Sequence, residues 1–229
     1  MQNTAVFVLY CQELKERVSP MMAELSRLNL DAIPIWDFPT PIHDVMERVT
    51  SRDIYTERES GWRITLSHYR AMKTALAMGA EQAFIMEDDV RFLRDTKAVW
   101  KALDEAPKDW QELRLTWGID RFNFKLIGEE RKENIGWSNL SGLPIVDFGA
   151  YMMKADIMRM YVDKVEQCLG GHGTLTISDR VLFGSNHKLY GAVPLLCVQK
   201  QFENANTAHW DLKEKAEAFG LDLERDYAV

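Results

Sequence analysis

The chain has 229 residues, 46% apolar and 28% charged, which is the composition of a soluble globular protein. Its net charge of −7 argues against non-specific binding to nucleic acid or to an anionic membrane. Three widely spaced cysteines, Cys11, Cys168 and Cys197, argue against a disulfide framework or a thiolate zinc site and favour a reducing, cytoplasmic setting. No run suits a signal peptide or a transmembrane segment, and the absence of repeats and linkers predicts a single domain over residues 1–229.

The beginning of the chain predicts a βαβ unit. Residues 5–10 are an apolar run typical of a buried strand, and apolar residues follow at helical spacing up to Leu28. Ser19 as N-cap with Pro20 at the first helical position would start that helix, after an irregular turn. Residues 32–36 predict a second strand, and strand, helix and strand in this order imply a parallel pair with a right-handed crossover.

The remaining elements are expected to alternate in the same way. Residues 37–61, rich in proline and polar side chains, predict a long loop of the kind that often forms a functional lid, with one helical turn near 44–49. The expected helices cover 62–78, 95–103 (capped by Asp95), 156–168 and a terminal segment from Asp211 to about Gly220. The expected strands cover 83–86, 113–117, 145–154, 188–193 and 195–200. This order predicts an α/β fold with a largely parallel central sheet.

One stretch carries the strongest chemical signal. The apolar run of residues 83–86 leads directly into three carboxylates, Glu87, Asp88 and Asp89. Unpaired charges are too costly to bury within a sheet, so the acids are expected at the carboxyl end of the strand, where open α/β sheets bind ligands. Adjacent acids raise one another's pKa unless a cation such as Mg²⁺ or Mn²⁺ neutralises them. On these residues alone, a metal site and an ordinary acidic turn remain equally open.

Two motifs together resemble glycosyltransferase family 25, the lipopolysaccharide and procollagen β-galactosyltransferases. Leu66-Ser67-His68 is similar to the helix motif of that family, and Met86-Glu87-Asp88-Asp89 to its "LEDD" strand end at about the same separation. Looser similarities are Gly149 to Lys154, Ser178-Asp179, and Pro194 through Gln199 to Phe202. The chain departs from the family at Arg63 and Ile64, where a Gly-Cys pair usually stands, and at Leu9, which replaces an asparagine.

The resemblance implies a GT-A fold, with a Rossmann-like, mostly parallel sheet. It implies transfer of a hexose, galactose or glucose, from a UDP-sugar to a hydroxyl of a glycan, lipopolysaccharide or protein acceptor, with inversion. A divalent cation, Mn²⁺ or Mg²⁺, would bridge the diphosphate. The implied metal ligands are Glu87 and Asp89, the implied general base is Asp179, and the implied donor-binding residues are Tyr10, Arg17, Ser67, His68 and Asp88. Asp179 reads equally well as a helix N-cap.

Two other functions remain open from the sequence. A catalytically impaired homologue could bind a sugar nucleotide or glycan without turnover, a reading that the residues at 63 and 64 keep open. A receiver-like or phosphoryl-transfer protein with an acidic Mg²⁺ pocket is disfavoured, because it needs acids after the first strand, where Leu9-Tyr10-Cys11 offers none. The sequence leaves the oligomeric state open.

Overall fold

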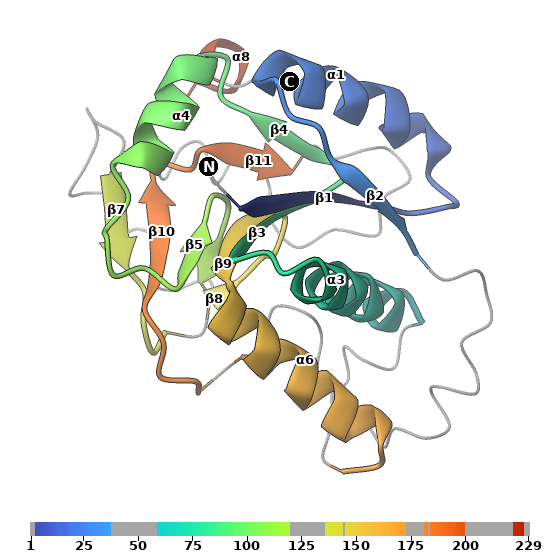
Figure 1. Cartoon of the computed structure of the whole chain (residues 1–229). Helices are drawn as coiled ribbons and strands as arrows, with labels where there is room; N and C mark the ends of the chain where they lie inside the picture. The colour runs from blue at the N-terminus through green and yellow to red at the C-terminus, as the bar shows by residue number, and fades with distance from the viewer. Residues whose placement is uncertain are drawn as a thin grey trace.

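The computed structural model of the protein describes residues 3–37, 59–119, 136–143, 145–172, 181–182, 184–199 and 222–226. Its centre is a seven-stranded sheet in the order β2-β1-β3-β9-β5-β10-β7 (Figure 1). These strands are β1 (Thr4–Tyr10), β2 (Ile33–Trp36), β3 (Gln82–Glu87), β5 (Glu112–Arg114), β7 (Gly136–Asn139), β9 (Ala150–Lys154) and β10 (Leu189–Val193).

Five of the seven strands run in the same direction. β1 is parallel to β2 and to β3, and β10 is parallel to β5. β9 lies antiparallel between β3 and β5, and β7 is antiparallel to β10. The predicted α/β class, with a largely parallel central sheet flanked by helices, is therefore confirmed.

Helices cover both faces of the sheet (Figure 1). Helices α1 (Val18–Leu28) and α4 (Thr96–Asp104) pack on one face, and α3 (Glu59–Ala77) and α6 (Ala155–Leu169) on the other. A hydrophobic core lies on each face. In β3, Phe84 and Met86 belong to the core under α1 and α4, and Ala83 and Ile85 to the core under α3 and α6, as the two-residue period of a strand requires. Burial on both faces explains why this strand reads as a continuous apolar run.

Two short strand pairs extend the structure beside the main sheet. β4 (Val90–Phe92) pairs antiparallel with β11 (Cys197–Gln199), so that Gln199 lies opposite Val90, directly after the acidic stretch. β6 (Gly118–Ile119) pairs antiparallel with β8 (Ile145–Val146). A 3-10 turn, η1 (Lys15–Arg17), precedes α1, and a short helix, α8 (Leu223–Asp226), lies near the end of the chain.

The first helix begins two residues earlier than expected. The helix begins at Val18 without a side-chain cap, so Ser19 is not its N-cap. Pro20 is still accommodated, because it falls in the first turn, where a backbone N–H has no partner within the helix. By contrast, Asp95 does cap α4, since its Oδ1 accepts the N–H groups of Lys97 and Ala98.

The prediction of one strand over residues 145–154 was wrong. The chain forms β8, breaks at Asp147, and resumes as β9 at Ala150. Asp147 has a φ of 78°, a left-handed conformation that no strand accommodates. The expected strand over 113–117 likewise ends early, because β5 stops at Arg114.

Several expectations fall outside the described residues. These are the helical turn near 44–49, the general base Asp179 and the terminal helix over 211–220. Among the described helices, none has both the length and the apolar character needed to cross a lipid bilayer.

Candidate functional site

The three acids lie at the carboxyl end of β3, as the sequence predicts. Glu87 is the last residue of that strand, and Asp88 and Asp89 form the turn into β4. They are not a solvated surface turn, because Asp88 is only 3% exposed and Asp89 only 2%. β1 ends at the same edge of the sheet, since Leu9 pairs with Glu87. Buried carboxylates at a sheet edge need partners, and the surrounding elements supply them.

Arg17 is the cation that pairs with two of these acids. Its Nη1 donates to Asp88 Oδ1 at 3.0 Å and to Asp89 Oδ2 at 3.2 Å, and all three side chains are buried. The remaining Asp88 oxygen, Oδ2, accepts the backbone N–H of Cys11 at 3.0 Å. Burial raises the pKa of Asp88, and the Cys11 N–H and the Arg17 charge oppose that rise. The 3-10 turn after β1 thus presents a guanidinium to the end of β3.

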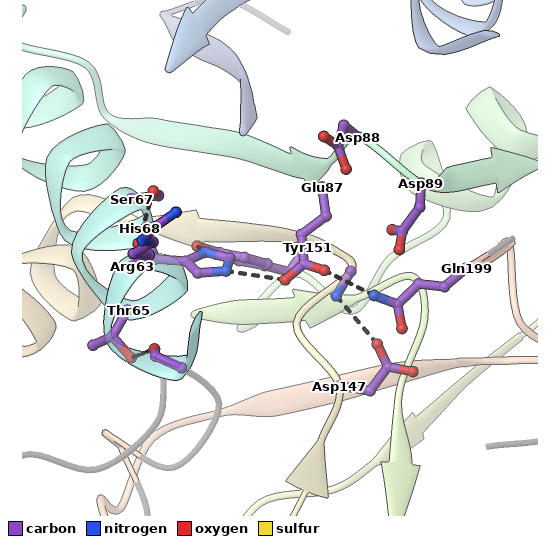
Figure 2. Close-up of polar contacts among 12 residues, drawn as sticks. Arg63, Thr65, Ser67, His68, Glu87, Asp88, Asp89, Asp147, Tyr151 and Gln199 are labelled. Atoms are coloured by element: carbon purple, nitrogen blue, oxygen red, sulfur yellow. Dashed lines mark hydrogen bonds and ion pairs between the residues drawn. The ribbon is translucent and has the colours of Figure 1, made fainter. Parts of the chain in front are cut away.

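Glu87 is held by a separate set of hydrogen bonds, drawn in Figure 2. Its Oε1 lies 3.2 Å from His68 Nε2, and its Oε2 accepts from Gln199 Nε2 at 2.8 Å. His68 Nδ1 lies 2.9 Å from the hydroxyl of Tyr151. An ionised Glu87 can only accept, so Nε2 carries the proton and Nδ1 of a neutral ring accepts from Tyr151. The structure places His68 of α3 beside the acidic cluster, between Tyr151 and Glu87, and its implied part in donor binding stays a prediction.

Asp89 Oδ1 is the exception in the acidic cluster. The other five carboxylate oxygens of Glu87, Asp88 and Asp89 have the partners described above, whereas Oδ1 is buried without one among the described residues. Burial, followed by the charge of Glu87, raises the pKa of Asp89 to about 8, although Arg17 opposes the rise. Arg17 thus offsets the negative charge of the cluster only in part, and Asp89 Oδ1 is an atom at which a further cation could bind.

A divalent cation fits this arrangement through Asp89. Mg²⁺ in enzymes is commonly held by one or two carboxylates, with water and phosphate oxygens completing the shell. Asp89 Oδ1 can supply such a ligand without losing a protein contact, whereas Glu87 would have to exchange His68 or Gln199 for the ion. The described residues contain no group of three His, Cys, Asp or Glu side chains arranged to hold a metal. The other ligands would then come from outside this group.

Two further predicted donor-binding residues, Tyr10 and Ser67, are both buried. Tyr10 is buried at the end of β1 and stacks on Trp36 with 5.0 Å between ring centroids. Its hydroxyl has no partner among the described residues, and burial followed by the charge of Asp88 raises its pKa. Ser67 faces its own helix instead, because its hydroxyl donates to the carbonyl of Arg63 at 2.8 Å. The structure brings Tyr10, Arg17, His68 and the three acids together, whereas the hydroxyl of Ser67 bonds within α3.

Arg63, which departs from the family motif, has a local role. It lies on α3, is largely buried, and its Nη1 donates to Glu13 Oε1 at 3.1 Å. The same nitrogen is 3.8 Å from Asp37 Oδ2, and Asp37 in turn accepts the backbone N–H of Gln12. Arg63 therefore connects α3 to the segments that follow β1 and β2.

Three residues at this edge were missed as site residues in the sequence. Trp36 ends β2 and is 38% exposed, Gln199 donates to Glu87, and Asp147 lies beside Gln199 (Figure 2). An aromatic residue at the end of a predicted strand could have indicated Trp36. Asp147 was hidden because residues 145–154 read as one strand. The place of Gln199 depends on a pairing between residues 105 to 109 positions apart, Cys197 with Phe92 and Gln199 with Val90.

The chain matches no family model and no curated protein. Similar solved structures include A197 from STIV, 10% identical over 92% of this chain and 100% of that one, with a TM-score of 0.44. A glycosyltransferase involved in glycosylation of the major capsid of PBCV-1 is 9% identical over 94% and 98% of the two chains, with a TM-score of 0.44. A mannose-1-phosphate geranyltransferase from Thermus thermophilus is 12% identical over 83% and 73%, with a TM-score of 0.42.

Proposed function

We propose that the protein is a metal-assisted glycosyltransferase that uses a nucleotide diphosphate sugar, a UDP-hexose, as donor. The observation that carries the proposal is the unpartnered, buried Oδ1 of Asp89 in an acidic cluster at the carboxyl edge of an α/β sheet. Such an edge is where open α/β sheets bind nucleotides. The resemblance to glycosyltransferase family 25 in the Leu66-Ser67-His68 and Glu87-Asp88-Asp89 motifs supports the same function.

Tyr10 and Trp36 suit the nucleoside end of this donor. The two rings stack at the carboxyl ends of β1 and β2, and Trp36 keeps 38% of its surface exposed. Stacking of a base on an aromatic side chain contributes about 1–3 kcal/mol and needs no specific hydrogen bond. Arg17 lies in the 3-10 turn that follows β1. A nucleotide whose base rests on Trp36 would direct its phosphates towards Arg17 and Asp89.

The roles of the remaining residues follow from charge. A bound Mn²⁺ or Mg²⁺ would neutralise charge on the departing diphosphate, and Asp89 is the residue that fits it best. Arg17 holds Asp88 and Asp89 in place, and His68, fixed by Tyr151, holds Glu87. Asp179, proposed from the resemblance, would take the proton of the acceptor hydroxyl. The acceptor is proposed to be a glycan, lipopolysaccharide or protein, and the transfer to invert the sugar.

UDP release from a panel of UDP-hexoses tests this function. The purified protein is incubated with UDP-galactose or UDP-glucose, with Mn²⁺ or with a chelator, and free UDP is measured. We expect release that requires Mn²⁺ and is lost in Asp89→Ala, while exchange of the exposed Asp163 for Asn leaves it unchanged. Full activity of Asp89→Ala in chelator would refute the metal role, and tight donor binding without release would instead identify an impaired homologue.

A further inference from the structure

Asp147 has a backbone conformation that its neighbours impose. Its φ of 78° is left-handed, a conformation that few residues other than glycine adopt. In the described part of the chain it shares this property only with Asn3 and Asn29 among non-glycine residues. Asn29 ends helix α1, an ordinary place for such a residue, whereas Asp147 interrupts a segment that would otherwise continue as strand. Such outliers often occur at functional sites.

Three hydrogen bonds hold Asp147 in place. Its Oδ1 accepts the N–H of Gly149 at 3.2 Å, and its Oδ2 accepts the hydroxyl of Thr116 at 3.3 Å. Its carbonyl oxygen accepts from Arg114 Nη1 at 3.1 Å. The Arg114 guanidinium also lies 3.5 Å from the centre of the Phe148 ring and pairs with the buried Glu112. The loop from Asp147 to Gly149 is thus rigidly attached to β5.

The same loop is attached to the acidic cluster. The N–H of Glu87 donates to the carbonyl of Gly149 at 2.7 Å. A Cβ at Gly149 would lie 2.9 Å from Gln199 Cγ, so the loop packs directly against the residue that donates to Glu87. Figure 2 shows the carboxylates of Glu87, Asp89 and Asp147 gathered around the Gln199 amide. The negative charge of Asp147 also contributes to the raised pKa of Asp89.

The charges around Gln199 divide the site into two sides. A diphosphate is repelled by the carboxylates of Glu87 and Asp147 and attracted by Arg17, so its place is on the Arg17 side or at a cation held by Asp89. Carboxylate and amide oxygens on the Asp147 side instead accept hydrogen bonds from neutral hydroxyl groups. Asp89 contacts Arg17 through Oδ2, and its Oδ1 has no partner among the described residues.

We propose that Asp147, together with Gln199, binds hydroxyl groups of the donor's sugar ring and so determines which sugar is accepted. This inference rests on the proposed function, since it assigns the sugar-binding side of the same site. The rigid attachment of Asp147 to β5 and β3 explains its strained backbone, because a hydroxyl-binding carboxylate discriminates between epimers only when its position is fixed.

Calorimetric titration with UDP and with UDP-galactose or UDP-glucose, all in Mn²⁺, tests this role. Asp147→Asn removes the charge, and asparagine tolerates a positive φ and can still accept the Gly149 N–H. We expect this variant to bind the preferred UDP-hexose about tenfold more weakly or worse, and to bind UDP as the parent protein does. Thr116→Val is the matched control, because it removes a hydrogen bond to Asp147 but leaves the carboxylate.

The outcomes separate the two proposals. If the parent protein binds UDP and a UDP-hexose but Asp147→Asn binds both unchanged, Asp147 has no part in sugar binding and the inference is overturned. If Thr116→Val loses the same affinity as Asp147→Asn, the role of Asp147 is structural and the inference is again overturned. Failure of the parent protein to bind any of the three ligands would overturn the proposed function itself.

Discussion

Asp89 is the residue at which burial and charge conflict most. It is 2% exposed, adjoins two other carboxylates and shares one guanidinium with Asp88. Its pKa of about 8 means that, without a further cation, the folded protein holds a proton that the unfolded chain releases near the ordinary value of 3.8. This residue therefore links stability to pH.

The sign of this linkage gives the first prediction. Because the pKa is raised on folding, the stability that Asp89 contributes is fully present below about pH 3.8 and is lost as pH rises towards 8. In metal-free buffer, Asp89→Asn should gain stability relative to the parent protein between pH 5 and pH 8, by up to about 1.4 kcal/mol per pH unit. Thermal unfolding at several pH values measures it. Parallel curves for the two proteins would contradict the raised pKa of Asp89.

At this scale the sequence located the acids correctly but not their partners. A continuous apolar run followed by acids is sufficient to place Glu87, Asp88 and Asp89 at a strand end, because burying unpaired charge is costly. Arg17 lies 71 and 72 positions from Asp88 and Asp89. The sequence indicated Arg17 as a donor-binding residue but did not predict its ion pairs with the two acids. Whether Glu87 also binds a metal stays a prediction, and the structure directs both of its oxygens to protein donors.

Among the elements, the sequence failed to predict the loop between β8 and β9, because residues 145–154 read as one strand. Hydrophobic periodicity reports which residues are buried. Residues 145 and 148 to 153 are all buried, so this periodicity does not mark the break at Asp147. The left-handed conformation there depends on contacts with β5 and with Gly149, which are visible only in the folded chain.

The close packing of this loop gives a second prediction. In Gly149→Ala the new Cβ would lie 2.9 Å from both Gln199 Cγ and Thr116 Cγ2, so side chains of the site must shift. We expect a loss of about 1–3 kcal/mol in unfolding free energy and weaker donor binding, measured by urea unfolding and by titration. Gly170→Ala is the control, since its nearest contact is 3.3 Å and its φ is −78°. Equal behaviour of the two variants would show that the loop is less closely packed than described.

Strand β5 gives a third prediction through its buried ion pair. Burial raises the pKa of Glu112, but the charge of Arg114 and the hydrogen bond from His187 lower it by more than burial raises it. The pKa of Glu112 therefore lies below its usual value. Replacing Arg114 with Met would leave a buried carboxylate without its main counter-charge and release the carbonyl of Asp147. We expect a loss of about 3–5 kcal/mol in urea unfolding. Lys101→Met, at an exposed cation of α4, should change stability by less than about 0.5 kcal/mol.

At the scale of the whole molecule, the order of elements was sufficient to predict the fold class. A βαβ start and alternating segments imply an α/β sheet, and β1, β2 and β3 are parallel as that rule requires. The insertion of β9 between β3 and β5 was not predictable in the same way. Hydrophobic periodicity carries no information on strand direction, and β9 pairs with a strand some 70 positions earlier in the chain, as in the pairing of Gln82 with Lys154.

The net charge of −7 bears directly on donor binding. A nucleotide diphosphate is itself anionic, and the site presents the carboxylates of Glu87, Asp88, Asp89 and Asp147, of which Asp88 and Asp89 pair with the guanidinium of Arg17. Electrostatic repulsion therefore opposes binding of the free nucleotide, and a divalent cation at Asp89 would reverse that effect. The proposed donor binding therefore depends on replacing this repulsion by attraction to a bound cation.

Titration of UDP into the protein, with Mn²⁺ and separately with a chelator, tests that claim most directly. We predict binding in Mn²⁺ that falls at least about tenfold in chelator, and a comparable loss in Asp89→Asn even when Mn²⁺ is present. Asp163→Asn should bind as the parent protein does. UDP binding of equal affinity in Mn²⁺ and in chelator, or unchanged in Asp89→Asn, would contradict the assignment of the acidic strand end as a metal-assisted nucleotide site.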